Sequence, residues 1–268
     1  MYQLADRVVL VTGASGGLGK ALCGQLLGRG ARVAAVDVDT RALELLAGEL
    51  GQDRLKTYPL DITRRSACVE VVEQVVAEWD AIDIVINNAG VTHFSRFDDS
   101  DLEVLKRVID INLMGTLNIT QAALPSIIAR QGMVVGLSSV AGFSPLYGRS
   151  AYSASKHGLE GFLSTLRAEL LERGVRVLMV CPAFIQTQPA QRSGAVAQGV
   201  ARPGLAAATS GRVMGPEEAA SAIVKAMERE RRRLLLGKVA LFAWIAGRFF
   251  PRLYEQIMIR QTRSEVES

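Results

Sequence analysis

Short apolar runs alternate with helical patterns along most of this 268-residue chain, and this alternation restricts the fold more than any other feature. The runs are rich in valine, isoleucine and leucine, as expected for strands buried on both faces of a sheet. Alternating strands and helices are typical of a parallel sheet covered by helices. We therefore predict an α/β fold, a Rossmann-like doubly wound parallel sheet of about seven strands in a single domain. The predicted strands are 7–11, 31–36, 55–60, 82–86, 133–137, 175–180 and 234–236.

Composition excludes several classes of protein. Apolar residues make up 49% of the chain, enough for a sizeable core. A net charge of +4 is too small to predict a nucleic-acid partner unless it is clustered. The cysteines at 23, 68 and 181 have neither metal-ligand spacing nor the pattern of a disulfide framework, and residues 1–7 lack a secretory signal. We expect a cytoplasmic protein without a bound metal.

A glycine-rich turn at 12–19 directly follows the first predicted strand and precedes a helical pattern at 20–27. Glycines let the backbone approach a pyrophosphate, and the helix N-terminus presents unpaired N–H groups to its charge. The alternative is an ordinary tight turn. The flanking strand and helix favour a dinucleotide site, which would be formed by Gly13, Ser15, Gly16, Gly17, Leu18 and Gly19.

Asp37 ends the second predicted strand, roughly 20 residues beyond the glycine-rich turn. A carboxylate at this place binds the adenosine ribose and repels a 2′-phosphate, so we predict NAD(H) rather than NADP(H). The alternative is that Asp37 caps the next helix, a role that Asp39 or Thr40 could also fill.

Tyr152 and Lys156 are four residues apart in a predicted helix at 151–171, so they lie on one face of it. A cation beside a phenol favours the phenolate, which prepares the phenol to exchange a proton near neutral pH. The pair by itself is weak, because this spacing arises by chance in many helices. Two further polar residues draw attention: Ser139 follows the fifth strand, and Asn112 lies inside a predicted helix at 102–128 although Asn is a mediocre helix former.

Over residues 5–237 the chain resembles the classical short-chain dehydrogenase/reductases. The resemblance rests on six motifs in the family's order and spacing, which together are far more specific than any one of them. They are Thr12-Gly-x-x-x-Gly-x-Gly19, Asp61-Ile62, Asn87-Asn-Ala-Gly90, Asn112, Ser139 and Tyr152-x-x-x-Lys156.

The resemblance implies hydride transfer between a nicotinamide cofactor and a carbinol or carbonyl carbon. Tyr152 would be the general acid/base, and Lys156 would hold the nicotinamide ribose and promote the phenolate. Ser139 would bind the substrate oxygen, and Asn112 would anchor a water for proton relay.

The resemblance also implies further residues of the cofactor cleft. There is one departure from the family pattern: the chain has Pro182-Ala183 where Pro-Gly is usual. The Cβ of Ala183 restricts the backbone conformations available near the nicotinamide. The implied cleft residues are Asp61, Ile62, Asn88, Ala89, Gly90, Pro182, Ile185 and Thr187.

The substrate site is the least defined by sequence. His93, Phe143 and Tyr147 are candidates for its wall, with plain loop packing as the alternative, whereas His157 should point away from Lys156. The stretch 183–213 is long for a connection and has no clear periodicity, which is typical of a lid.

Residues 238–268 form an extension beyond a catalytic domain at 1–237. Its apolar run, 239–247, is far shorter than the ~20 residues that span a bilayer, and arginines follow at 248, 252, 260 and 263. The extension could lie on an anionic membrane as an amphipathic helix. It could instead pack on the body, close the substrate cleft or join a subunit interface, and we favour this second interpretation.

These features predict an NAD(H)-dependent enzyme acting on a secondary alcohol or ketone of an apolar, lipid- or steroid-like substrate. An NADPH-dependent carbonyl or acyl-chain reductase is disfavoured by Asp37. A non-catalytic dinucleotide sensor is disfavoured because Ser139, Tyr152 and Lys156 are all present. From the family's habit we expect a homodimer or homotetramer.

Overall fold

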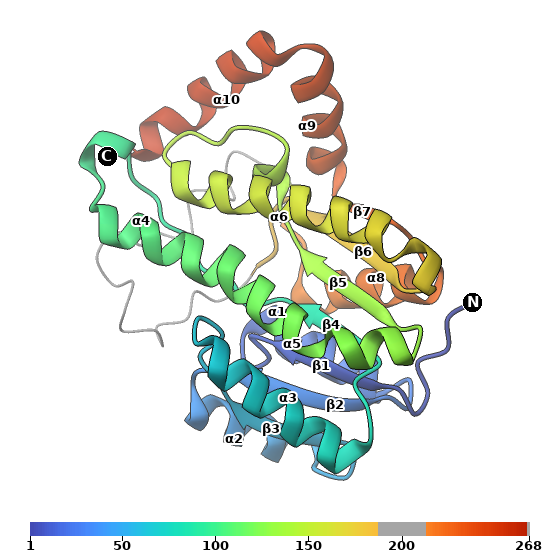
Figure 1. Cartoon of the computed structure of the whole chain (residues 1–268). Helices are drawn as coiled ribbons and strands as arrows, with labels where there is room; N and C mark the ends of the chain where they lie inside the picture. Colours follow the sequence, from blue (N-terminus) through green and yellow to red (C-terminus); the bar gives the residue numbers. More distant parts are fainter. Residues whose placement is uncertain (187–212, 267–268) are drawn as a thin grey trace.

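A seven-stranded parallel sheet forms the centre of the molecule (Figure 1). The structure is a computed structural model that describes residues 1–186 and 213–266. The strand order is β3-β2-β1-β4-β5-β6-β7, which confirms the predicted doubly wound α/β fold. The strands are β1 Val8–Thr12, β2 Arg32–Asp37, β3 Leu55–Pro59, β4 Ile84–Asn87, β5 Met133–Leu137, β6 Arg176–Pro182 and β7 Arg233–Leu236.

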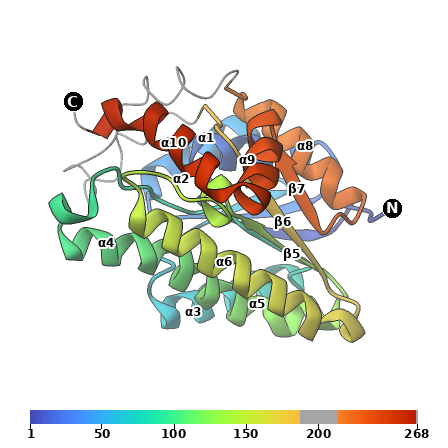
Figure 2. The same cartoon turned by 90° about the horizontal axis from the view of Figure 1, so that it is seen from above.

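Helices cover both faces of the sheet and bury its central strands completely (Figure 2). Alternate side chains of β1 serve the two cores: Val9 and Val11 face one core, and Val8 and Leu10 face the other. The helices of the first face are α1 Gly17–Leu27, α2 Thr40–Leu50 and α8 Pro216–Glu228. Those of the second face are α3 Arg65–Trp79, α5 Thr116–Ala129 and α6 Ser150–Glu169.

The chain reverses its direction of travel across the sheet between β1 and β4. From β1 it builds outward through β2 to β3, and it then returns to place β4 on the other side of β1. In open parallel sheets, ligands bind at such a switch point, outside the carboxyl ends of the strands. The carboxyl ends of β1, β4, β5 and β6 therefore lie at the edge of the sheet where we expect the predicted site residues.

The prediction of one helix at 102–128 is wrong in detail. Two α-helices, α4 Leu102–Ile109 and α5, are joined by the π-helical segment η2, Asp110–Gly115. Gly115 has no room for a side chain, because a Cβ would lie 2.6 Å from the side chain of Ile62. Asn112 lies in the π-helical turn, and such turns are frequent at functional sites.

Strand β4 begins at Ile84, two residues later than predicted. The backbone N–H of Ile82 donates to the Ser126 hydroxyl at 2.8 Å, so this group is used by a helix side chain and not by the sheet. Strand β5 has the predicted limits, and the limits of the remaining strands lie within two residues of the prediction, as is usual for strand ends.

The C-terminal extension is a helical hairpin of α9 Lys238–Phe249 and α10 Pro251–Val266, at the top of Figure 1. It packs on the short 3-10 helix η3, Val140–Gly142, and on the segment that follows it. Among the described residues, no helix is both long enough and apolar enough to cross a bilayer.

Candidate active site

Tyr152 and Lys156 lie one turn apart near the start of α6. The Lys156 ammonium is 5.7 Å from the centre of the Tyr152 ring. Lys156 is buried, and its Nζ donates to the backbone carbonyl of Leu137 at 2.7 Å, at the end of β5. The bond between helix and strand therefore holds the lysine beside the half-buried tyrosine.

Burial lowers the pKa of Lys156 to about 8. Desolvation disfavours an ammonium, and the nearby Cys181 opposes this effect only in part. The amine is thus mostly protonated at pH 7 and loses its charge within the physiological range above it.

Ser139 follows β5 directly and is buried. Its Oγ accepts a hydrogen bond from the Ala141 N–H at 3.2 Å, which caps η3. A hydroxyl that accepts this bond keeps its own proton available to donate to another oxygen. This property suits the predicted role of Ser139 toward a substrate oxygen.

Asn112 is fully buried and clasps the backbone of Val91 in both directions. Its Oδ1 accepts from the Val91 N–H at 2.8 Å, while its Nδ2 donates to the Val91 carbonyl at 2.9 Å and to the Ser155 hydroxyl at 3.0 Å. Asn112 thereby ties the segment that follows β4 to α6. Its predicted role in anchoring a water stays a prediction.

Asn112 and Lys156 converge beside Gly90, which is exposed. A Cβ on Gly90 would lie 3.2 Å from Asn112 Oδ1 and 3.6 Å from Lys156 Nζ. A side chain here would fill the space next to both polar groups, so glycine keeps the approach to them open.

The glycine-rich turn is shaped for close approach. Gly13 has a φ of 63°, and a Cβ on it would lie 2.8 Å from the Ala89 Cα, so neither the backbone conformation nor the space admits another residue. Helix α1 starts at Gly17 with no side-chain cap and no acidic residue in its first turn, and both Gly16 and Gly17 are exposed. These N–H groups fit the phosphates of a dinucleotide.

Asn88 connects the end of β4 to this turn. Its Nδ2 donates to the carbonyls of Thr12 and Gly13, each at 3.0 Å. In return the Thr12 hydroxyl accepts from the N–H groups of Asn88 and Ala89, each at 3.1 Å. The sequence reasoning missed this role of Thr12, although its position as the last residue of β1 before the glycines was a usable signal.

Asp37 lies at the end of β2 and holds the glycine-rich turn. Its Oδ2 accepts from the Ser15 hydroxyl at 2.6 Å and from the Ser15 N–H at 3.1 Å. Helix α2 is capped by Asp39, whose carboxylate accepts from the Ala42 N–H at 2.9 Å. Asp37 is therefore not the helix cap considered as the alternative.

Asp61 and Ile62 follow β3 by two and three residues. The exposed Asp61 carboxylate accepts from the Thr63 N–H and hydroxyl at 3.0 and 2.7 Å. Ile62 is buried against Gly115, which couples this loop to the π-helical segment. Their predicted position beside adenine stays a prediction.

The end of β6 carries the departure from the family pattern. Ala183 donates its N–H to the Leu236 carbonyl at 3.1 Å and packs with the apolar cluster under α9. Pro182 ends β6, and Ile185 forms a bridge with Met214. Thr187 and most of the predicted lid, 183–213, lie outside the described residues.

The three candidate substrate residues divide into two groups. Phe143 and Tyr147 pack against α9 and α10, and Tyr147 also lines a hollow of about 340 Å³ between residues 95–98 and 146–150. His93 is buried, and burial lowers its pKa, so its imidazole is neutral at pH 7. Its Nε2 lies 3.4 Å from the Ser100 hydroxyl.

The sequence also did not reveal a partly buried polar cluster behind the site. The Glu160 carboxylate accepts from the Ser138 hydroxyl at 3.1 Å, from the Cys181 thiol at 3.2 Å and from Arg233 at 2.9 Å. It joins the ends of β5 and β6 to α6 one turn beyond Lys156. The signal in the sequence was that Glu160 follows Lys156 by four residues and so lies on the same face of the helix. Its partner Arg233, however, is 73 residues away in the sequence.

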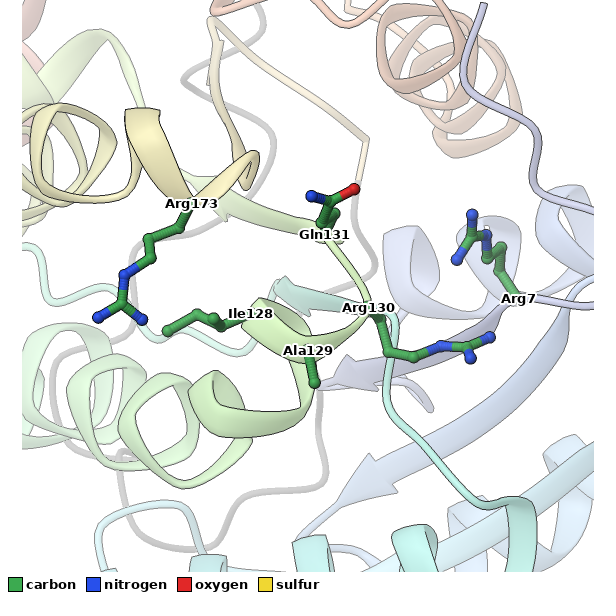
Figure 3. Close-up of a pocket in the computed structure, with 6 residues that line it drawn as sticks. All are labelled: Arg7, Ile128, Ala129, Arg130, Gln131 and Arg173. Atoms are coloured by element: carbon green, nitrogen blue, oxygen red, sulfur yellow. The ribbon is translucent and has the colours of Figure 1, made fainter.

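A hollow of about 440 Å³ lies at the opposite edge of the sheet, near the amino ends of the strands. Figure 3 shows the residues that line it. None of the predicted site residues that the structure describes lines it. Its lining residues are Arg7, Ile128, Ala129, Arg130, Gln131 and Arg173.

The chain belongs to the short-chain dehydrogenase family, whose model matches residues 7–197. It is 33% identical to SadH of Mycobacterium tuberculosis over 96% of both chains. It is 36% identical to the 3-oxoacyl-[acyl-carrier-protein] reductase FabG of Thermotoga maritima, over 83% of this chain and 90% of that protein. A short-chain dehydrogenase structure from Streptomyces avermitilis superposes with a TM-score of 0.81 at 29% identity, over 97% of this chain and 99% of the other.

Family and fold together define an oxidoreductase that interconverts alcohols and ketones with NAD(P). The cofactor carries the hydride, and the protein orients it and handles the proton. The family prediction made from the six motifs is confirmed.

Proposed function

We propose that this protein is an NAD(H)-dependent oxidoreductase that transfers hydride between the nicotinamide and the carbon of a secondary alcohol or ketone on an apolar substrate. The proposal rests chiefly on the placement of Tyr152, Lys156 and Ser139 at one edge of the sheet. In the oxidative direction, Tyr152 takes the proton of the substrate hydroxyl while the hydride leaves the carbinol carbon. Reduction runs the same exchange in reverse.

The residues of the proposed site have different roles. Ser139 donates to the substrate oxygen, and the Lys156 ammonium favours the phenolate of Tyr152 and holds the nicotinamide ribose. Asn112 holds Val91 and Ser155, and it anchors the relay water. The dinucleotide is bound by the turn from Gly13 to Gly19 and by these further residues: Asp37, Asp61, Ile62, Asn88, Ala89, Gly90, Pro182, Ile185 and Thr187.

Asp37 supports the preference for NAD(H). Its carboxylate is fixed at the end of β2 by Ser15, beside the turn expected to bind pyrophosphate. A second negative group, such as a 2′-phosphate, would meet like charge there. The similarity to an acyl-carrier-protein reductase supports the second candidate, an NADPH-dependent carbonyl or acyl-chain reductase.

An apolar substrate, lipid- or steroid-like, is supported by the wall next to the site. Phe143, Leu146 and Tyr147 lie between Ser139 and α6 and pack with α9 and α10. We further propose a catalytic domain at 1–237 with its lid at 183–213, an extension at 238–268, a homodimer or homotetramer, and a cytoplasmic location.

Replacing Tyr152 by Phe tests the proposal directly. The variant keeps the ring and loses the hydroxyl, so kcat should fall by about 10²–10⁴-fold. NADH binding, followed by nucleotide fluorescence, should stay close to that of the wild type because the ring and Lys156 remain. Turnover within about tenfold of the wild type would refute the role of Tyr152.

The ratio of kcat/KM for NADH to kcat/KM for NADPH tests Asp37. We expect a preference for NADH of at least about tenfold, because the carboxylate repels a 2′-phosphate. Asp37→Asn keeps a hydrogen-bond acceptor for Ser15 and removes the charge, so it should bring this ratio closer to one. A wild-type preference for NADPH would overturn the cofactor proposal and leave the hydride-transfer proposal standing.

A further inference from the structure

Helix α9 turns its small residues inward and its large apolar residues outward. Ala240, Ala243 and Ala246 are buried. The large residues that face solvent, between 42% and 65% exposed, are Leu241, Phe242, Ile245 and Phe249. At about 100° per residue these four lie within roughly a third of the helix circumference, opposite the alanines. A surface helix of a water-soluble protein normally shows the reverse arrangement.

Close packing fixes this orientation. The Ser144 hydroxyl donates to the Ala243 carbonyl at 3.1 Å, and a Cβ on Gly247 would lie 2.7 Å from Ser144 Oγ. Larger side chains on this side of α9 would push the helix away from the body. The apolar residues therefore cannot exchange places with the alanines by rotation of the helix.

The same surface continues onto α10. Phe250 and Leu253 are 61% and 56% exposed, whereas Tyr254 and Met258 are buried against the segment before α6. We call the following set the apolar face: Leu241, Phe242, Ile245, Phe249, Phe250 and Leu253. Six large exposed residues, on two adjoining helices and at Phe250 between them, indicate a surface that binds a partner.

Charge identifies the partner. Residues 238–260 contain four exposed basic side chains, those of Lys238, Arg248, Arg252 and Arg260, and one acidic side chain, that of Glu255. A symmetric contact between two copies would place these cations against one another. A layer of anionic lipid headgroups complements them, and its acyl region accepts the apolar side chains.

We propose that α9 and the start of α10 dock in the plane of an anionic lipid surface, with the apolar face inserted and the basic residues at the headgroups. The hairpin also packs on the segment 140–147 that leads to Tyr152, so docking would bring the candidate site close to the lipid. The statement that docking brings the candidate active site close to the lipid rests on the proposed function, whereas the docking itself does not.

Cosedimentation of the full chain with lipid vesicles tests the docking. One set is phosphatidylcholine alone, and the other contains about one third phosphatidylglycerol. The wild type should pellet with the anionic vesicles, remain in the supernatant with the neutral ones, and bind less as salt is raised. Recovery of the wild type in the supernatant with both sets would overturn the proposal, whatever its enzymatic activity.

Two double variants separate the contributions. Phe242→Glu with Phe249→Glu removes the apolar insertion, and Arg248→Glu with Arg252→Glu reverses the charge. Each should lower the bound fraction by about tenfold or more. The matched control for the phenylalanine pair is Leu45→Glu with Leu171→Glu, which adds the same charge as that pair at exposed leucines of α2 and η4, Leu171–Arg173, and should bind like the wild type.

Circular dichroism and NADH binding establish that each variant is folded. If one double variant does not fold, the other is enough to test the proposal. Equal binding by wild type and folded Phe242→Glu/Phe249→Glu would overturn the proposal. Light scattering measures the molar mass of each protein in solution. A smaller oligomer for this variant, together with a wild type that does not bind anionic vesicles, would also overturn the proposal, because the apolar face would then join copies of the chain.

Discussion

Lys156 combines two properties that oppose each other. Its ammonium is needed beside Tyr152, yet the site that places it there removes it from water. The bond to the Leu137 carbonyl keeps the nitrogen in position, and burial brings the pKa to about 8. The charge of this lysine should therefore respond to pH close to neutrality.

We predict that NADH binding weakens above pH 8. Below this value Lys156 carries its charge, and above it the amine is neutral, so affinity that depends on the ammonium is present at low pH and lost at high pH. Measured by fluorescence in Tyr152→Phe, which removes the phenol, the dissociation constant should rise by up to about tenfold per pH unit.

The matched control is the double variant Tyr152→Phe/Lys156→Met, because it also lacks the phenol, removes the titrating amine and keeps a side chain of similar length. Its affinity should be weaker than that of Tyr152→Phe at pH 7 and nearly independent of pH. A flat profile in Tyr152→Phe up to pH 9.5 (roughly 1.5 units past the pKa) would show that the ammonium does not bind the cofactor.

At the scale of elements, Asp83 ties three neighbouring strands together at their amino ends. Its side chain is completely buried and accepts from the Val8 N–H at 2.9 Å, from Arg7 at 2.6 Å and from Arg130 at 3.1 Å. Burial acts to raise the pKa of Asp83, but these three donors outweigh it and the pKa is lowered. Asp83 thus stays ionised within the fold.

Asp83→Asn should destabilise the protein by about 1–3 kcal/mol at pH 7, because two arginines lose their shared carboxylate. Urea unfolding or the Tm measures this. Because the pKa is lower in the folded state, the contribution is complete above the unfolded pKa, near 3.9, and is lost as the pH falls below it. The difference between wild type and variant should therefore shrink below about pH 4.

The exposed ion pair of Asp6 with Arg54 offers a matched control. Asp6→Asn makes the same chemical change at a solvated carboxylate and should barely alter stability, since surface pairs contribute little. If both variants unfold at the same urea concentration as the wild type, Asp83 does not hold the strands together.

At the scale of the whole molecule, the sheet could be predicted because each strand is marked locally. A run such as 133–137 is apolar throughout, which indicates burial on both faces whatever its neighbours are. The glycine-rich turn and the Tyr152–Lys156 spacing are also local, because a turn and one helical turn determine them. Because parallel strands bring their carboxyl ends to one edge of the sheet, the location of the site could be predicted as well.

Contacts over long sequence separations could not be predicted in this way. The clasp of Asn112 on Val91 depends on the π-helical turn that faces Asn112 toward β4, and no local propensity predicts that turn. The bond from Arg233 to Glu160 exists only because β7 lies beside β6. Both arrangements are decided by how elements pack.

The C-terminal extension separates the two kinds of information. By itself the sequence determined that 239–247 is apolar, too short to span a bilayer and followed by arginines. The tertiary structure decided which side of α9 meets the body. A side chain at Gly247 would collide with Ser144, and the buried alanines of α9 pack on the body, so Phe242 and Phe249 are left in solvent. Composition is a property of the segment alone, whereas orientation depends on the surface against which it packs.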